Sequence, residues 1–282
     1  MNFYYLPSRR CVILWSQKCA CTSISRWIKA SFKEAKICEK GESTRTYLAK
    51  NGYNFPLKNL TPWIRSNEGE LQHAIISSRD PISRITSSFV NKFHVYENRT
   101  IFDNKKKIQG FSKHFSKELL GLKNKQSGEK RRQGDFSLQE LIEYLYYMRD
   151  ELKKINPHFT PQINTAEDFS VIKSLIKSDI NVHPLRIGHF SDDLRDINTK
   201  LELKMMPSSV NSTSLPSNEW RFDSSADSAS KTVSILHQQK LIPNANALRE
   251  LLQQKPHLQQ QFWELFQYDF ALQDAMNHLS KN

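Results

Sequence analysis

The stretch CVILWSQKCACTS, residues 11–23, decides the fold. Its first five residues, Cys11–Trp15, form a short apolar run that is typical of a buried strand in a parallel sheet. A polar turn follows, and the next apolar residues recur at the spacing of one helix face. These residues are Ile24, Trp27, Ile28 and Phe32. A strand, a turn and a helix in this order predict the opening unit of a nucleotide-binding α/β fold.

The turn over residues 16–23 has the chemistry of a phosphate loop without glycine. The first glycine of the chain is Gly41, so the Walker pattern is absent. Small residues let the backbone approach an anion, amides at a helix N-terminus point at it, and a lysine adds a mobile charge. The predicted binding residues are Lys18, Cys19, Ala20, Cys21, Thr22 and Ser23. On this stretch alone, a helix N-cap beside a surface lysine explains the pattern equally well.

A second strand and helix follow at residues 74–93. Ala74–Ser78 reads as a strand, Asp80 as an N-cap, and Pro81 fits the first turn of a helix. Arg79 stands at the strand end, where α/β folds bind ligands, and its guanidinium suits a second phosphate. Ser87 lies two turns into the helix and should face the same side as the loop. The alternative is an Arg79–Asp80 surface pair with Ser87 as a small packing residue.

The rest of the chain predicts one domain over residues 1–282, with a mainly parallel central sheet flanked by helices. Ser137 and Glu140 form a capping box at the start of a helix. Further elements are predicted as a helix at 169–176, a strand at 180–187, a helix around residues 191–201 and a helical C-terminus. Residues 104–132 form a basic insertion, either a solvated arm or a cover over the acceptor site. Residues 207–230 are rich in Ser, Asn and Pro and predict a long surface loop.

The composition narrows the class of protein. The 282 residues are 38% hydrophobic and 11% aromatic, enough for a sizeable core. No apolar window reaches the length of a membrane span, and the first apolar run is too short for a signal peptide. Four cysteines near the N-terminus predict reduced thiols in a cytoplasmic protein and no metal site. The net charge of +12 indicates an anionic partner or substrate.

These motifs resemble the carbohydrate sulfotransferase family that includes the chondroitin and dermatan 4-O-sulfotransferases. The family's loop, approximately Pro-Lys-Val-Ala-Cys-Thr-Ser/Asn, is similar to residues 17–23, with Gln17 for the proline and Cys19 for the valine. Its second motif, Arg-Asp-Pro-x-x-Arg-x-x-Ser followed by Lys-Phe, is similar to residues 79–93. Two shorter segments, 158–162 (HFTPQ) and 268–270 (YDF), also resemble family patterns. The resemblance spans roughly residues 10 to 272 and points to a soluble, bacterial-type member, because the disulfide cysteines of luminal relatives are not evident.

The resemblance implies a P-loop-NTPase-like sulfotransferase fold and a donor, 3′-phosphoadenosine 5′-phosphosulfate, that needs no metal. Lys18 would stabilise the leaving phosphate, the loop hydroxyls would hold the 5′-phosphate, and Arg79 with Ser87 would hold the 3′-phosphate. The acceptor would be a hydroxyl of a carbohydrate, and the positive charge suits an acidic glycan. His158 is the first candidate for the base, because histidine titrates near neutral pH. His73, a glutamate, or a purely structural His158 are the alternatives.

Two other functions stay open at this point. A nucleotide kinase or hydrolase on a degenerate phosphate loop would need magnesium and an acidic ligand at a strand end, where this sequence places Arg79. A non-catalytic polyanion-binding protein would use the basic stretch at 104–132. Aromatic residues do not alternate with the cations of that stretch, as binding of single-stranded nucleic acid would require, so no nucleic-acid partner is predicted.

Overall fold

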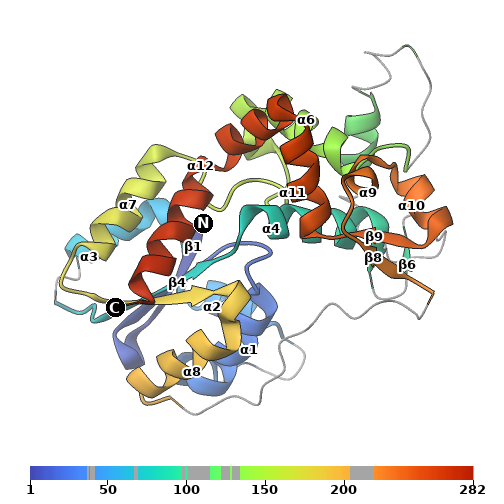
Figure 1. The fold of residues 1–282 in the computed structure, drawn as a ribbon. Helices are drawn as coiled ribbons and strands as arrows, with labels where there is room; N and C mark the ends of the chain where they lie inside the picture. The colour runs from blue at the N-terminus through green and yellow to red at the C-terminus, as the bar shows by residue number, and fades with distance from the viewer. Residues whose placement is uncertain are drawn as a thin grey trace. The chain divides into compact units, whose positions relative to one another are not determined.

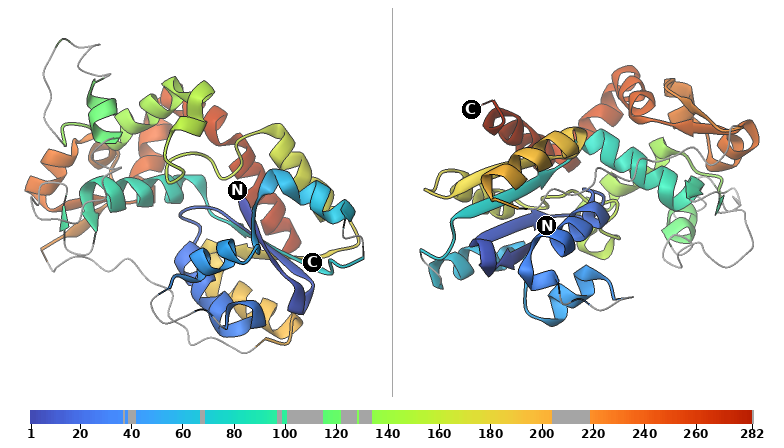
Figure 2. Two further views of the ribbon diagram at one scale, coloured as in Figure 1. Left: turned by 180° about the vertical axis from the view of Figure 1, so that it is seen from behind. Right: turned by 90° about the horizontal axis from the view of Figure 1, so that it is seen from below.

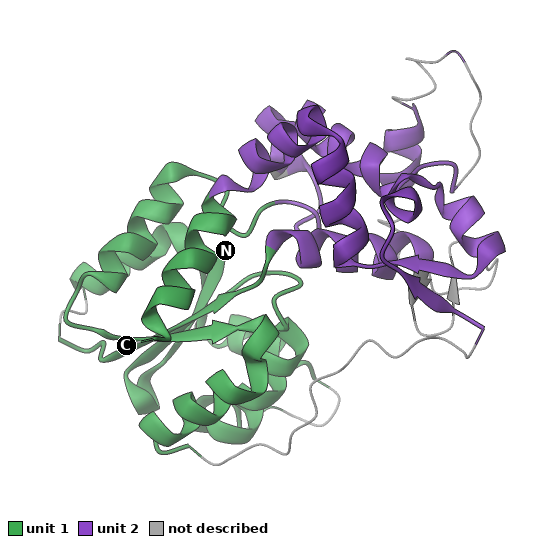
Figure 3. Ribbon diagram, in the orientation of Figure 1, with its two compact units in different colours: residues 1–80, 161–212, 268–282 green, residues 81–160, 213–267 purple. Residues whose placement is uncertain are grey.

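The fold is taken from a computed structural model that describes residues 1–36, 38, 42–66, 69–96, 99–100, 115–121, 128, 134–203 and 219–281. Figure 1 shows its helices and strands. The contacts divide the chain into two compact units, coloured separately in Figure 3. Unit 1 comprises residues 1–80, 161–212 and 268–282, and unit 2 comprises residues 81–160 and 213–267. Each unit is described by itself.

Unit 1 contains a five-stranded sheet with the order β3-β1-β2-β4-β7. The strands are β1 (Asn2–Leu6), β2 (Cys11–Trp15), β3 (Asn54–Pro56), β4 (His73–Ser78) and β7 (Asn181–Arg186). β2 pairs parallel with β4, and β4 pairs parallel with β7, whereas β1 pairs antiparallel with both of its neighbours. Four of the five strands therefore run in one direction, and their carboxyl ends meet at one edge.

Helices cover both faces of this sheet (Figure 2). One face packs on α1 (Cys21–Ser31), α2 (Thr44–Lys50) and α8 (Phe190–Lys200), and the other on α3 (Leu60–Ser66), α7 (Ala166–Ile176) and the last part of α12 (Pro256–Leu279). Short helical turns complete the unit at η1 (Pro7–Arg9), η2 (Lys33–Ala35), η3 (Leu57–Asn59) and η6 (Ile187–His189). Because apolar cores cover both faces of the sheet, a ligand can reach it at the ends of the strands.

Unit 2 is built mainly from helices around an aromatic core. Its elements are α4 (Pro81–Phe89), η4 (Val90–His94), β5 (Val95–Tyr96), β6 (Arg99–Thr100), α6 (Leu138–Tyr147), η5 (Arg149–Lys154), β8 (Arg221–Asp223), α9 (Ala226–Ser230), α10 (Val233–Gln239), β9 (Leu241–Pro243), α11 (Ala245–Gln254) and the first part of α12. The ring of Phe93 lies 5.1 Å from that of Phe159 and 5.5 Å from that of Phe115. Phe159, part of the segment 158–162, is therefore a core residue of this unit.

The structure confirms the elements that the sequence patterns predict most strongly. The strand at 11–15, the helix after the loop, the second strand and the helix that begins at Pro81 are all present. The capping box of Ser137 and Glu140 is also formed. The helices and the strand predicted between residues 169 and 201 appear as α7, β7 and α8.

One expectation needs correction, two strands were not predicted, and two predicted segments lie largely outside the described residues. Residues 221–230, predicted as loop, form β8 and α9, because β8 pairs with β9 from a later part of the chain. Strands β1 and β3, on one side of the sheet, were not predicted. Of the basic insertion, only residues 115–121 and 128 are described, and residues 207–218 of the second loop are outside the described part. The prediction of a single domain stays a prediction. In the part of the chain that the structure describes, no helix has the length and apolar character needed to cross a membrane.

Candidate phosphate-binding site

The loop between β2 and α1 uses the backbone conformations of glycine without containing one. Lys18 has φ of 64° and Ala20 has φ of 51°, both in the left-handed region. A side chain in this region costs about 1–2 kcal/mol per residue relative to the right-handed helix. Left-handed residues in a turn direct successive backbone N–H groups into a concave nest that binds anions. The missing glycines therefore do not remove the shape of a phosphate loop.

The first turn of α1 supplies the donors that the loop presents. Ala20 is the N-cap, without a side-chain cap, and the first helical hydrogen bond runs from Ile24 N to Ala20 O at 2.9 Å. The amides of residues 21–23 precede this bond, so they have no acceptor within the helix. Thr22 is exposed and Ser23 is 8% exposed, and the first turn holds no acidic residue. An anion at this end is favoured by the amides and by the helix dipole.

Arg79 joins the loop from the neighbouring strand. Its Nη1 donates to the carbonyl oxygen of Lys18 at 2.8 Å. The contact arises because β2 and β4 are parallel neighbours, and Arg79 directly follows the end of β4. The structure thus brings together the loop and the arginine, which the sequence analysis had assigned to two different phosphates. Both carry positive charge at the carboxyl edge of the sheet, where α/β folds bind their ligands.

Gln162 connects these two parts, and the sequence analysis gave it no role. Its Oε1 accepts from Cys19 Sγ at 2.5 Å and from Ser16 Oγ at 3.4 Å. Its Nε2 donates to the carbonyl oxygen of Arg79 at 3.1 Å. The side chain is only 1% exposed, so these bonds form away from competing water. Gln162 therefore fixes the loop relative to the end of β4.

Asp269 holds Gln162 in place from the end of the chain. Its carboxylate accepts from the backbone N–H of Gln162 at 2.9 Å and of Ile163 at 3.0 Å. Asp269 is completely buried, and bonds from backbone N–H groups to a buried carboxylate are stronger than those between neutral groups. The segments 158–162 and 268–270 were singled out only as family patterns. The sequence signal that could have indicated their role is a polar residue between apolar neighbours: Gln162 lies between Pro161 and Ile163, and Asp269 lies between Tyr268 and Phe270.

The remaining predicted residues lie in unit 2. Ser87 is on α4, partly buried, and its carbonyl oxygen accepts from Asn91 Nδ2 at 2.9 Å. The Nδ1 of His158 lies 2.5 Å from Asn156 Oδ1, which also accepts from the backbone N–H of His158. Since a carbonyl oxygen can only accept, this contact places a proton on Nδ1 and makes Nε2 the basic nitrogen of the neutral ring. Such a tautomer suits a base. The carbonyl oxygen of His158 accepts from Ser88 Oγ at 2.7 Å, and this bond fixes the segment.

His73, the alternative base, lies at the wrong end of the sheet. It is the first residue of β4, a six-residue strand, whereas Arg79 follows the last. At the rise of an extended strand this separation is about 20 Å. A base must lie within hydrogen-bond reach of the proton that it removes. The structure therefore removes His73 from the candidates for this site.

Two further expectations concern cysteine and metal chemistry. All four cysteines are free, and Cys11, Cys19 and Cys38 are buried. Burial raises the pKa of the Cys11 thiol well above its ordinary value, so this group stays neutral. Among the residues that the structure describes, no group of three or more His, Cys, Asp or Glu side chains could hold a metal ion.

The fold and the loop define the class: an α/β protein with a lysine-containing loop at a helix N-terminus, at the carboxyl edge of its sheet. Comparison with protein families agrees, because the profile described as the sulfotransferase family matches residues 3–273. The chain belongs to the sulfotransferase family. Membership supports sulfotransferase activity in general and names neither donor nor acceptor. No curated protein and no solved structure matched the chain.

The left-handed residues of the loop lead to a test of stability. Ala20→Gly relieves the left-handed strain, which offsets the greater freedom of glycine in the unfolded chain. We expect the free energy of unfolding to stay unchanged or to rise by up to about 1 kcal/mol. Ala30→Gly, at an exposed position of α1 with ordinary helical geometry, should lower it by about 0.5–1 kcal/mol. Urea denaturation measures both, and equal losses in the two variants would contradict the assigned conformation.

The support from Asp269 leads to a second test. In Asp269→Asn, the NH₂ group replaces an oxygen that accepts a backbone N–H, so one buried donor loses its partner. We expect the free energy of unfolding to fall by about 2–3 kcal/mol. Asp274→Asn, an exposed position on the same helix, should change it by less than about 0.5 kcal/mol. Urea denaturation of the two variants measures both changes. If Asp269→Asn unfolds at the same urea concentration as the unchanged chain, Asp269 does not stabilise the segment of Gln162.

Proposed function

We propose that the chain transfers a sulfuryl group from 3′-phosphoadenosine 5′-phosphosulfate to a hydroxyl of a carbohydrate, on a P-loop-like fold. The observation that carries this proposal is the bond from Arg79 Nη1 to Lys18 O, 2.8 Å long. It joins a cation at the end of one strand to the phosphate loop after its neighbour. A donor with phosphates on both sides of its ribose needs two such anion-binding groups beside each other. Family membership supports the sulfuryl chemistry.

The loop residues have distinct parts in the proposed reaction. The acceptor oxygen forms a bond to sulfur while the bond from sulfur to the 5′-phosphate oxygen breaks, and 3′,5′-adenosine bisphosphate leaves. The first-turn amides with Thr22 and Ser23 hold the 5′-phosphate, and Lys18 neutralises charge that develops on its leaving oxygen. Positioning and positive charge do most of the catalysis in transfers of this type. The acceptor proton passes to a base.

The assignments in unit 2 rest on the sequence motifs. Ser87 is proposed to bind the 3′-phosphate together with Arg79, and His158 is proposed as the base. The Nδ1–H tautomer supports the second assignment, because it leaves the lone pair of the neutral ring on Nε2.

The residues at the carboxyl end of β4 favour a sulfotransferase over a kinase. β4 ends in Ser77 and Ser78, followed by Arg79, whereas a magnesium-dependent kinase would use a carboxylate there.

Binding of nucleotides tests the donor. We expect 3′,5′-adenosine bisphosphate to bind more tightly than ATP with magnesium, measured by calorimetry. Arg79→Ala should weaken binding of the bisphosphate by about 10- to 100-fold, because a charged hydrogen bond contributes about 1.5–3 kcal/mol. Arg65→Ala, an exposed position on α3, is the matched control and should bind as the unchanged chain does. Tighter binding of ATP, or unchanged affinity in Arg79→Ala, would refute the assignment.

Transfer of labelled sulfate tests the role of Lys18. Lys18→Ala should lower kcat by about 100- to 1,000-fold, the effect of removing one donor from a developing charge. Binding of 3′,5′-adenosine bisphosphate should change much less, since the amides of the loop remain. The assay uses a panel of neutral and acidic glycans, and Lys58→Ala on η3 serves as the control. If kcat is retained in Lys18→Ala, another group stabilises the leaving oxygen.

A further inference from the structure

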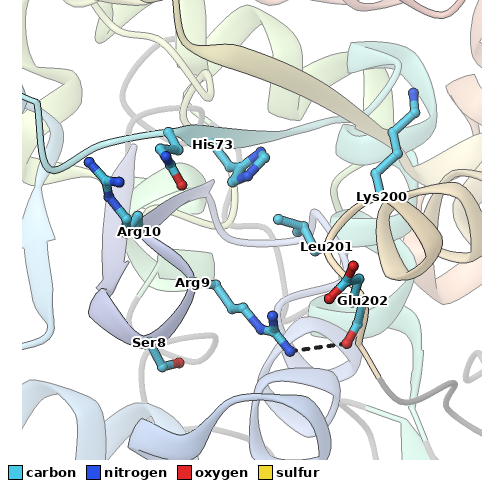
Figure 4. A pocket seen from close by; sticks show the side chains of 8 residues that line it. Ser8, Arg9, Arg10, His73, Lys200, Leu201 and Glu202 are labelled. Carbon is cyan, nitrogen blue, oxygen red and sulfur yellow. Dashed lines mark hydrogen bonds between the residues drawn. The ribbon is translucent and has the colours of Figure 1, made fainter.

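A cavity of about 260 Å³ lies at the amino end of the sheet in unit 1, away from the phosphate loop (Figure 4). We call it the amino-end pocket. It is formed by the turn before β2, the start of β4 and the end of α8. Its lining residues are Ser8, Arg9, Arg10, Gln72, His73, Lys200, Leu201 and Glu202. Three of these are cations and one is a carboxylate, so the lining has an excess of positive charge.

The two arginines of the pocket are held by neutral groups. Arg9 Nη2 donates to the carbonyl oxygen of Glu202 at 3.0 Å, a contact drawn in Figure 4. Arg10 Nε donates to the carbonyl oxygen of Glu70 at 3.0 Å, and its Nη2 donates to that of Gly69. Among the described residues, neither arginine takes part in an ion pair. A carbonyl oxygen satisfies a donor without cancelling its charge, so both guanidiniums are oriented and keep their positive charge beside the one lining carboxylate, Glu202.

His73, which lines the pocket, contacts a second histidine, His183 on β7. His73 Nδ1 lies 3.1 Å from His183 Nε2, so one ring donates to the other. His183 is 6% exposed, and burial with the charges of His73 and Lys200 lowers its pKa to about 4. Burial also lowers the pKa of His73. His183 therefore stays neutral near pH 6, and any proton taken up by the pair is held by His73 at the cavity.

We propose that the amino-end pocket is a second anion site, which binds a small tetrahedral oxyanion such as sulfate or phosphate together with a proton on His73. The protonated ring donates from Nδ1 to His183 and from Nε2 to the anion. The two arginines supply most of the attraction, and Lys200 contributes less because it is paired with Asp196 at 2.9 Å. The site lies about 20 Å from Arg79, the length of β4, and is independent of the donor site.

The proton coupling follows from the charges around His73. They are Arg9 and Arg10 before β2, His183 on β7, Asp196 and Lys200 on α8, Glu202 after α8, and Glu34, which accepts from Ser8 Oγ. In the empty pocket, burial disfavours a charge on His73. An anion reverses this balance, because an opposite charge within hydrogen-bond distance favours the charged ring. Binding of the anion and protonation of His73 must then strengthen each other by the same factor.

Proton NMR of the histidine rings in the full chain tests the proposal, with sulfate as the probe. Sulfate keeps its charge over the range in which phosphate itself titrates. At constant ionic strength in chloride, saturating sulfate should raise the midpoint of His73 by about one pH unit. The phosphate loop lies beyond the Debye length of about 10 Å, so sulfate bound there does not affect this resonance. A midpoint that does not move, or that drifts without saturation, would overturn the proposal and identify adventitious binding only.

Charge-removing variants locate the effect. Arg9→Gln and Arg10→Gln should each weaken the sulfate-dependent shift severalfold, and Arg65→Gln on α3 should leave it unchanged. His73→Gln should still bind sulfate in calorimetry but without proton uptake, which is read from the dependence of the heat on the buffer. A full shift in both pocket variants would overturn the proposal, as would proton uptake that persists in His73→Gln.

Discussion

The site depends on one side chain, the buried carboxamide of Gln162. A carboxamide can accept and donate at once, and here it accepts from the loop and donates to the carbonyl oxygen of Arg79. The loop and Arg79 follow parallel strands, so the sheet alone sets the distance between their backbones. It does not set the conformation of the loop. Gln162 supplies this second constraint, and Asp269 in turn fixes the backbone of Gln162.

This arrangement explains how the loop keeps a strained shape without glycine. Lys18 and Ala20 in the left-handed region together cost about 2–4 kcal/mol. Cys19 between them is completely buried and bonded to Gln162, and Lys18 O accepts from Arg79. These contacts hold both sides of the strained residues, as is needed for strain to persist in a folded chain. In the proposed reaction, the side chain of Lys18, which glycine would lack, acts on the leaving oxygen.

Local patterns were sufficient to predict the elements that carry the loop. The apolar run at 11–15, the helical spacing after it and the capping box at Ser137 each depend on neighbours in sequence, and each is present. Strand β3 was missed because it pairs only with β1, which is far away in the sequence. Strand β1 forms a local hairpin with β2, a pairing that the sequence analysis did not consider. Gln162 and Asp269 acquire their roles only through contacts with segments 107 and 143 residues away, which no single-sequence pattern specifies. His73 was considered as a base because of its residue type alone. Its position at the first residue of β4, far from Arg79, was not taken into account.

The two proposed anion sites lie at opposite ends of β4 and would use different chemistry. At the carboxyl end, the helix dipole and loop amides favour an anion, and Arg79 and Lys18 add full charges. At the amino end, the charged side chains that line the pocket supply the attraction. A site of amides keeps its charge at any pH, whereas a site that includes a histidine binds an anion more tightly as pH falls. Donor binding at the loop should therefore be insensitive to pH near neutrality, and the amino-end pocket responds in that range.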